Sequence, residues 1–318
     1  MRRTFAEASI APRCGAVGSC ESPPLAEALT VIAGPTASGK TALAIRLAQR
    51  TGAEIVSADS QQVYRHFDIG TAKPSPEELA AVPHHLISVV DPREVFSAAR
   101  FQALADEAIR DIQARGRSVL VVGGTGMYLR ILLHGLVAAP PADPALRGQL
   151  EQEGLAQGWP ALHARLREID PASAERIQPQ DRVRIVRALE IHALTGKPAS
   201  LWRSEHGFLP DRYPFQLFVL DPPREALYQA IDLRARALFD NGLVDEVRSL
   251  IARGYEHASP MGSVGYKEAL AVVRGTLTVD DAIRLVARDT RHYAKRQQTW
   301  FRKEPRATFL RPPYAELS

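Results

Sequence analysis

The chain has 318 residues, of which 45% are hydrophobic and 24% charged, a composition that fits a globular protein of one or two domains. Its 40 basic and 36 acidic side chains leave a net charge of +4, which permits a polyanionic partner without requiring one. The two cysteines, Cys14 and Cys20, are too few for a disulfide framework, and no apolar run is long enough to cross a membrane, so we expect a cytoplasmic protein.

Residues 1–27 show no periodic pattern of apolar residues and no apolar segment long enough for a secretory signal. We interpret them as a disordered N-terminal extension. Residues 28–33 then form a short apolar run typical of a β-strand, and the first motif follows directly after it.

A phosphate-binding loop occupies residues 34–41, which read G-x-x-x-x-G-K-T and lead into an apolar pattern with helical spacing. Its two glycines allow the backbone to turn so that successive N–H groups line one concavity, which binds anions together with the helix N-terminus. Lys40 adds charge for a terminal phosphate, and Thr41 offers a hydroxyl to Mg²⁺. The loop consists of Gly34, Pro35, Thr36, Ala37, Ser38, Gly39, Lys40 and Thr41. The motif leaves open whether the ligand is a nucleotide such as ATP or another diphosphate.

Two further strands are predicted to end in a carboxylate. Asp59 follows the second strand, and because ligands of a parallel sheet gather at its carboxyl edge, we expect Asp59 beside the phosphate loop. There it can bind Mg²⁺, abstract a proton or cap a turn. A third strand is predicted over 86–90, and Asp91 after it matches either a Walker B carboxylate or the start of a turn before Pro92.

A glycine-rich loop should reach the same edge. We expect a helix over 96–112 with Ser97 as its cap, and then a fully buried strand over 118–122. The strand runs into Gly-Gly-Thr-Gly, so that Thr125 offers a hydroxyl at this edge, unless the loop is only a structural turn.

The strand and helix alternation stops at the proline-rich residues 138–144. Residues 140–209 read as a helical insertion, which divides the core into 28–139 and 210–318. Helices are expected within the insertion over 146–153, 159–169, 172–177 and 183–194. Arg184 and Arg187 lie one turn apart and form either a basic stripe for phosphates or a solvated helix face.

The core pattern resumes with a fifth strand over 215–220 and a helix over 224–250, in which Arg234 lies beside an apolar stripe. Near the C-terminus, residues 290–303 interleave basic and aromatic side chains. This segment suits a nucleic-acid groove, where phosphates meet cations and bases stack on rings, or a basic amphipathic helix with its aromatic side chains packed inward.

Read together, these segments resemble the tRNA dimethylallyltransferases, the IPP transferase family. The matching segments are GPTASGKT (34–41), ADSQQVY (58–64), GTAKP (70–74), FSAARFQ (96–102), GGTGMYL (123–129), DRVRIVRALEIHALTGKP (181–198), VGYKE (264–268) and TRHYAKRQQTWFR (290–302). The phosphate loop alone is widespread, whereas this ordered set is specific. The resemblance implies a P-loop NTPase/kinase-like α/β core, with a parallel sheet flanked by helices and an inserted all-helical subdomain. We expect a monomer.

The resemblance also implies a reaction. A dimethylallyl group would pass from dimethylallyl diphosphate to N6 of adenosine 37, next to the anticodon, in tRNAs that read codons beginning with U. The phosphate loop and Arg234 would hold the diphosphate, with Mg²⁺ as cofactor on Thr41. Asp59 would be the general base, and Thr36, Lys40 and Arg234 would complete the catalytic set.

Contacts with the tRNA anticodon stem-loop are implied for three segments and two single residues. These are Asp59, Ser60, Gln61 and Gln62; Val183, Arg184, Ile185, Val186 and Arg187; Gly262, Ser263, Val264, Gly265, Tyr266 and Lys267; and Thr125 and Arg147. The chain departs from many relatives at Gln61, where they have Leu or Met, so the wall of the base pocket differs here.

Three other functions remain open at this point. The phosphate loop alone would suit an ATP-dependent kinase for a small molecule or nucleoside. The cations of 182–187 and 291–303 would suit a non-catalytic RNA-binding protein. A transferase that acts on free AMP or ADP is the nearest competitor, but the long helical insertion favours a large tRNA substrate.

Overall fold

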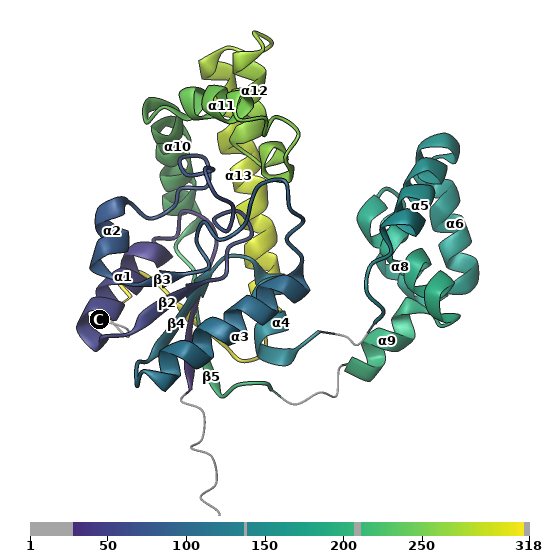
Figure 1. Ribbon diagram of the computed structural model, residues 1–318, viewed down its shortest axis with the longest axis horizontal. Coiled ribbons are helices and arrows are strands. Elements are labelled where there is room, and N and C mark those ends of the chain that lie inside the picture. The colour runs from purple at the N-terminus through teal and green to yellow at the C-terminus, as the bar shows by residue number, and fades with distance from the viewer. Residues whose placement is uncertain (1–27, 137–138, 207–210, 315–318) are drawn as a thin grey trace, which may run out of the picture.

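The computed structural model describes residues 28–136, 139–206 and 211–314, so the predicted N-terminal extension lies outside the described residues. At its centre is a six-stranded sheet in the order β3-β2-β4-β1-β5-β6, in which every neighbouring pair of strands is parallel (Figure 1). The strands are β1 Leu29–Ala33, β2 Glu54–Ser57, β3 His84–His85, β4 Val119–Gly123, β5 Phe215–Leu220 and β6 Ala307–Leu310. The predicted parallel α/β core is therefore confirmed.

Helices cover both faces of the sheet, which explains why its central strands are almost continuously apolar. Helix α1 (Lys40–Thr51) packs on one face, against strand side chains such as Ile32. Helices α3 (Ala98–Ala114) and α4 (Gly126–His134) pack on the other face, against side chains such as Val31. Successive residues of each strand thus alternate between two separate cores.

The third strand is shorter and lies earlier than the predicted 86–90. In that segment Leu86 and Ser88 have φ values of 65° and 54°, left-handed conformations that a β-strand excludes. Val90 forms only an isolated bridge with Tyr64. The prediction was wrong because this apolar run is a loop: Leu86 and Val90 are buried by loop packing, whereas Val89 is 38% exposed.

The helix predicted over 224–250 is two helices, α10 (Arg224–Asp240) and α11 (Leu243–Ala252). Gly242 separates them with a left-handed φ of 94°. Strand β6 has no counterpart in the sequence-based expectations, because four residues, ATFL, at the edge of the sheet are too short a run to show a period.

The insertion is entirely helical and has a core of its own. Its helices are α5 Pro144–Gln157, α6 Trp159–Ile169, α7 Pro171–Arg176, α8 Arg182–Thr195 and α9 Ala199–His206, of which α9 was not predicted. Leu150, Leu166, Ile185 and Leu189 are among the side chains buried between them. The group stands to one side of the sheet in Figure 1. Within the described ranges, no helix combines the length and the apolar character needed to cross a membrane.

A second group of helices extends the core beyond the carboxyl edge of the sheet (Figure 1). It contains α10, α11, the 3₁₀ turn η1 Ser259–Gly262, α12 Tyr266–Val273 and α13 Val279–Phe301, while the short helix α2 Pro76–Ala81 lies beside α1. Helix α13 is the longest of the described helices, and it runs from this group down to the sheet, where Phe301 joins the core under α3 and α4. Its middle therefore passes the ends of the strands.

Candidate active site

The phosphate loop has the backbone geometry that its sequence predicts. Gly34 has a φ of 152°, and a Cβ at this position would lie 3.0 Å from the carbonyl oxygen of Leu220. Gly39, with a φ of 81°, directly precedes α1. Ala37 also has a left-handed φ, of 63°, which is a strained conformation for a residue with a side chain. The loop thus turns sharply from β1 into the N-terminus of α1, where free N–H groups attract anions.

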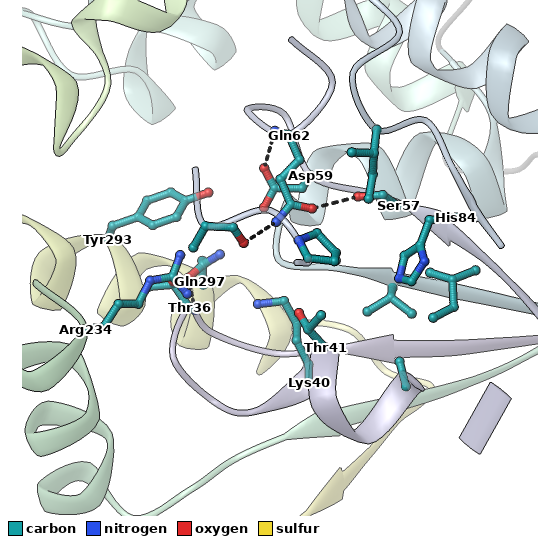
Figure 2. A pocket seen from close by; sticks show the side chains of 17 residues that line it. Thr36, Lys40, Thr41, Ser57, Asp59, Gln62, His84, Arg234, Tyr293 and Gln297 are labelled. Atoms are coloured by element: carbon teal, nitrogen blue, oxygen red, sulfur yellow. Dashed lines mark hydrogen bonds between the residues drawn. The ribbon is translucent and has the colours of Figure 1, made fainter. Parts of the chain in front are cut away.

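A cavity that we call the loop cavity opens beside this turn (Figure 2). Thr36, Lys40, Thr41, Asp59 and Arg234 all line it. They come from the phosphate loop, the start of α1, the segment after β2 and the middle of α10. The structure therefore brings together the residues that the sequence predicts for a phosphate site and for a base.

The electrostatics of the loop cavity favour an anion. Burial lowers the pKa of Lys40 to about 8, a shift that the nearby Asp59 carboxylate opposes and the Arg234 guanidinium reinforces. Burial also lowers the pKa of Arg234, again against the opposing effect of Asp59. Two desolvated cations face a single carboxylate here. The positive charge of Lys40 and Arg234 together exceeds the negative charge of Asp59, and a diphosphate that entered the cavity would offset the excess.

The lowered pKa of Lys40 predicts a pH dependence of diphosphate binding. In the free protein Lys40 is charged below about pH 8 and neutral above it, whereas a bound diphosphate raises the pKa of the amine. We expect the affinity advantage of the wild type over Lys40→Met for inorganic diphosphate to be constant below about pH 7 and to fall roughly tenfold per pH unit above pH 8. Calorimetric titration from pH 6.5 to 9.5 measures this, and a constant advantage throughout would contradict it.

Asp59 is held by its own turn. Its Oδ1 accepts hydrogen bonds from the backbone N–H groups of Gln61, at 2.8 Å, and Gln62, at 3.3 Å. Both bonds use the same oxygen, so Oδ2 remains as the atom for a substrate proton. The hydroxyl of Thr125 accepts a hydrogen bond from the N–H of Ser60 at 3.2 Å and so holds the same turn from the loop after β4.

Asp59 also lines another cavity, of about 320 Å³, which we call the second cavity. Thr36, Asp59, Arg234 and Tyr293 line both cavities, so the two meet at these four side chains. The volume lies within the range of about 300–1,000 Å³ that is usual for small-ligand sites. Of the predicted RNA-contacting residues, its wall contains Ser60, Gln61, Gly262, Ser263 and Val264.

The rest of that predicted segment faces elsewhere. Tyr266 is fully buried, and its hydroxyl donates to Glu246 and accepts from the N–H of Gly70 at 3.1 Å. Lys267 forms ion pairs with Asp289 at 3.0 Å and Glu268 at 3.3 Å. Tyr266 therefore supports the wall of the second cavity from behind, because its ring is packed in the core of the helical group.

Asp91, the candidate Walker B carboxylate, lies outside both cavities. Its Oδ1 accepts from the N–H of Arg93 at 2.9 Å, and its Oδ2 accepts from the hydroxyl of Tyr255 at 3.2 Å. β4, one of the two strands that pair with β1, ends in Gly123 and continues into Gly124, not into a carboxylate. The geometry thus favours the turn-starting role of Asp91.

The insertion candidates divide into buried and exposed residues. Ile185 and Val186 are buried in the core of the insertion, so their side chains stabilise α8 and do not reach a partner. Arg147 and Arg187 both pair with Glu190, whose side chain is fully buried. Val183 and Arg184, in contrast, have exposed side chains, and the ion pair of Arg184 with Asp181, at 2.9 Å, lies at the surface.

A cleft lies between α4 and the insertion, and we call it the insertion cleft. Its volume is about 780 Å³. Five arginines line it: Arg130, Arg176, Arg184, Arg187 and Arg203. Three of the five also form ion pairs within the protein, with Glu304, Asp181 and Glu190 respectively for Arg130, Arg184 and Arg187. Guanidinium groups suit the phosphates of a nucleic acid, so the cleft is a candidate RNA surface.

These placements predict different effects for two arginines that the sequence treats alike. We expect Arg184→Met to weaken tRNA binding about 3- to 10-fold and to lower the salt slope of log K by about 1, because a phosphate contact is lost. Arg147→Met should instead lower the free energy of unfolding by about 1–2 kcal/mol, since Glu190 loses two hydrogen bonds while Arg147 itself is 40% exposed. Filter binding at several salt concentrations and urea unfolding separate the two; equal effects in both assays would contradict this division.

The sequence-based reasoning missed several residues of the loop cavity. Tyr293 and Gln297 point into it from α13, Ser57 from the end of β2 and His84 from β3 (Figure 2). Burial and the negative charge of Asp59 raise the pKa of Tyr293 to about 12. The spacing of four between Tyr293 and Gln297 was a usable signal, because it places both on one side of a helix.

The donor atoms in the loop cavity fit Mg²⁺. This ion is commonly held by one or two protein oxygens together with substrate phosphates and water. Thr41 and Asp59 offer oxygens here, and among the described residues no three His, Cys, Asp or Glu side chains gather to form an all-protein metal site. Thr41 remains the predicted ligand.

Fold and site together define a P-loop α/β protein in which an anion-binding cavity meets a second cavity at a carboxylate and an arginine. The family model "IPP transferase" matches residues 62–304. The chain belongs to the IPP transferase family.

Known proteins similar to this chain agree with that assignment. The tRNA dimethylallyltransferase of Myxococcus xanthus (strain DK1622) is 65% identical over 286 residues, which cover 90% of this chain and 93% of that protein. That of Anaeromyxobacter dehalogenans (strain 2CP-C) is 56% identical over 286 residues, 90% of this chain and 95% of that protein.

Two solved structures extend the comparison. The full-length tRNA isopentenylpyrophosphate transferase of Bacillus halodurans has a TM-score of 0.66 and 40% identity, with 90% of each chain covered. A eukaryotic dimethylallyltransferase acting on tRNA has a TM-score of 0.76 and 28% identity, and the match covers 91% of this chain and 76% of that chain.

Proposed function

We propose that this chain transfers a dimethylallyl group from dimethylallyl diphosphate to N6 of adenosine 37 in tRNAs that read codons beginning with U. The observation that carries the proposal is the meeting of the two cavities at Thr36, Asp59, Arg234 and Tyr293. A diphosphate in the loop cavity and a nucleobase in the second cavity would approach each other at this point, with the Asp59 carboxylate between them.

In this reaction the adenine N6 attacks the C1 carbon of the donor, the C1–O bond breaks, and its electron pair leaves with the diphosphate. Lys40, Arg234 and the N–H groups at the start of α1 offset the negative charge that grows on the departing oxygen. Asp59 accepts the proton that N6 loses, which helps because an exocyclic adenine amine is a poor nucleophile. Mg²⁺, when bound at Thr41, would add further positive charge to the diphosphate.

The acceptor enters as an unstacked base. Bases of RNA loops are commonly recognised when splayed out into a pocket, and the second cavity provides such a pocket beside Asp59. The insertion cleft, with its five arginines, supports a large RNA as the carrier of that base. We include in the proposal that the enzyme is a cytoplasmic monomer.

The alternative functions are less well supported. A kinase of the P-loop type could use Asp59 as its Mg²⁺ carboxylate, since Asp91 lies outside the loop cavity and β4 leads into Gly124. It would, however, leave the second cavity and the insertion cleft without a use. A transferase for free AMP would have no use for the insertion cleft. A purely RNA-binding role would leave the partly buried cations Lys40 and Arg234 of the loop cavity without a purpose.

The test is mass spectrometry of nucleosides after incubation of the protein with dimethylallyl diphosphate, Mg²⁺ and a tRNA anticodon stem-loop. We expect N6-dimethylallyladenosine at position 37, and no product from a stem-loop with guanosine there. Free AMP is offered in parallel, and faster modification of AMP than of the stem-loop would replace the tRNA substrate. ATP turnover without dimethylallyl transfer would establish a kinase.

A further inference from the structure

One buried amide joins the two sides of the site. Gln297, on α13, is 6% exposed and lines the loop cavity. Figure 2 shows Gln297 beside Thr36. The Oε1 of Gln297 accepts a hydrogen bond from the N–H of Thr36 in the phosphate loop at 2.8 Å, and its Nε2 donates to the carbonyl oxygen of Gly124 at 2.8 Å. Both hydrogen-bonding ends of this side chain are therefore engaged by backbone groups from two different loops.

The two loops are also in close contact at this point. A Cβ on Gly124 would lie 2.3 Å from the Nε2 of Gln297 and 3.2 Å from the carbonyl oxygen of Gly34, so no larger residue fits without movement. The phosphate loop and the loop after β4 thus lie directly against each other, with the amide of Gln297 bridging them. Helix α13 is anchored in the sheet core through Phe301, one turn further on, which gives the bridge a rigid support.

The bridge continues to the proposed base. Thr125 follows Gly124 in the chain, and its hydroxyl accepts the N–H of Ser60 at 3.2 Å. Ser60 follows Asp59, whose Oδ1 is fixed by the turn that begins there. A continuous path of hydrogen bonds and short chain segments therefore runs from the diphosphate-binding loop through Gln297 to the carboxylate.

We propose that Gln297 is a positioning residue that sets the distance between the leaving diphosphate and the Asp59 carboxylate. This inference rests on the proposed transfer reaction. In-line transfer requires the departing oxygen, the C1 carbon, the N6 atom and the base to be aligned, and a misplacement of about 1 Å can cost about 10²-fold in rate. Gln297 itself need not touch the reacting atoms, since it acts through the two loops that it joins.

The test compares Gln297→Met, which keeps the length of the side chain without its hydrogen bonds, with Gln298→Met as a matched control. Gln298 is the next residue on α13, lies outside both cavities, and donates to Asp221 Oδ1 at 3.2 Å. We expect the single-turnover transfer rate of Gln297→Met at saturating substrates to fall about 100-fold, with the Kd values for donor and stem-loop within about threefold of the wild type. The control should keep the wild-type rate.

Hydrogen exchange adds a readout that is independent of activity. Deuterium uptake is expected to become about tenfold faster in Gln297→Met for peptides that contain Thr36 and Ser60, and to stay unchanged for the strands of the sheet. If Gln297→Met does not fold, Gln297→Asn replaces it, because it keeps the amide but shortens its reach by one methylene; the same pattern with a smaller rate loss is expected.

The outcomes are separable. If the wild type transfers no dimethylallyl group, the proposed function is refuted. Hydrogen exchange at Thr36 and Ser60 then still tests whether Gln297 holds the two loops together. An active wild type with an equally fast Gln297→Met, or with unchanged exchange at Thr36, refutes the positioning role. A rate loss that is fully explained by weaker donor binding also refutes it, because Gln297 would then belong only to the diphosphate site.

Discussion

Replacing Asp59 with asparagine is expected to lower the rate of dimethylallyl transfer by about 10²- to 10⁴-fold, the usual contribution of a positioned general base. The asparagine oxygen can still accept the N–H of Gln61, so the turn should keep its shape, but the amide cannot take up the N6 proton. Binding of dimethylallyl diphosphate should survive or become tighter, because a negative charge beside Lys40 and Arg234 is removed.

Asp91→Asn is the matched control for this prediction. Asp91, like Asp59, is a carboxylate that directly follows an apolar run in the sequence. Its oxygens accept hydrogen bonds from Arg93 and Tyr255, and it lies outside both cavities. Its replacement should leave the single-turnover rate unchanged within about twofold. Equal losses in the two variants, or near-wild-type transfer by Asp59→Asn, would remove Asp59 from the role of base.

Replacing Arg234 with methionine is expected to lower kcat/KM by about 10²- to 10³-fold, the range seen when one donor to a developing negative charge is lost. Arg234 is a desolvated cation that lines both cavities, so its charge acts on the departing diphosphate with little screening by water. Methionine keeps most of the length and the apolar packing of the side chain. Arg234→Lys should restore part of the loss, because it returns the charge without the planar fork.

Arg236→Met serves as the control, since Arg236 lies two residues further along α10 and is exposed. Steady-state kinetics with both substrates varied show where the loss falls. A change confined to KM for the stem-loop, with kcat unaltered, would mean that Arg234 binds RNA and does not stabilise the leaving group.

Much of the site could be predicted because its residues follow strands or open a helix. The spacing of Gly34, Gly39 and Lys40 is a local property, and it defines the phosphate loop without any tertiary information. Asp59 was predictable for a related reason: the ends of parallel strands share one edge of the sheet, so a residue directly after a strand has a known position.

Burial within a helix face was harder to predict. Ile185 and Val186 belong to a segment for which the family resemblance implies contacts with RNA. The packing of α8 against α5 and α6 instead buries their side chains in the core of the insertion. Arg187 and Glu190 lie three residues apart on one helix, a spacing that permits an ion pair. The pairing of Arg147 with the same Glu190 could not be predicted, because the two residues are 43 positions apart in the chain. An arginine that pairs with a buried carboxylate and one that pairs at the surface look the same in a sequence.

The amino-acid sequence by itself determined the phosphate loop, the parallel α/β core and the position of Asp59, because each depends on spacings of a few residues within one segment. Only the tertiary structure decided that Asp91 lies outside the site, that Tyr293 lines both cavities and that Gln297 joins the two loops. The last two facts depend on how α13 crosses the ends of strands far earlier in the chain, and Asp91 is held outside the site by Tyr255, 164 residues later in the chain. The spacing of Tyr293 and Gln297 indicates only that they share one side of a helix, because long-range packing decides which loops that side meets.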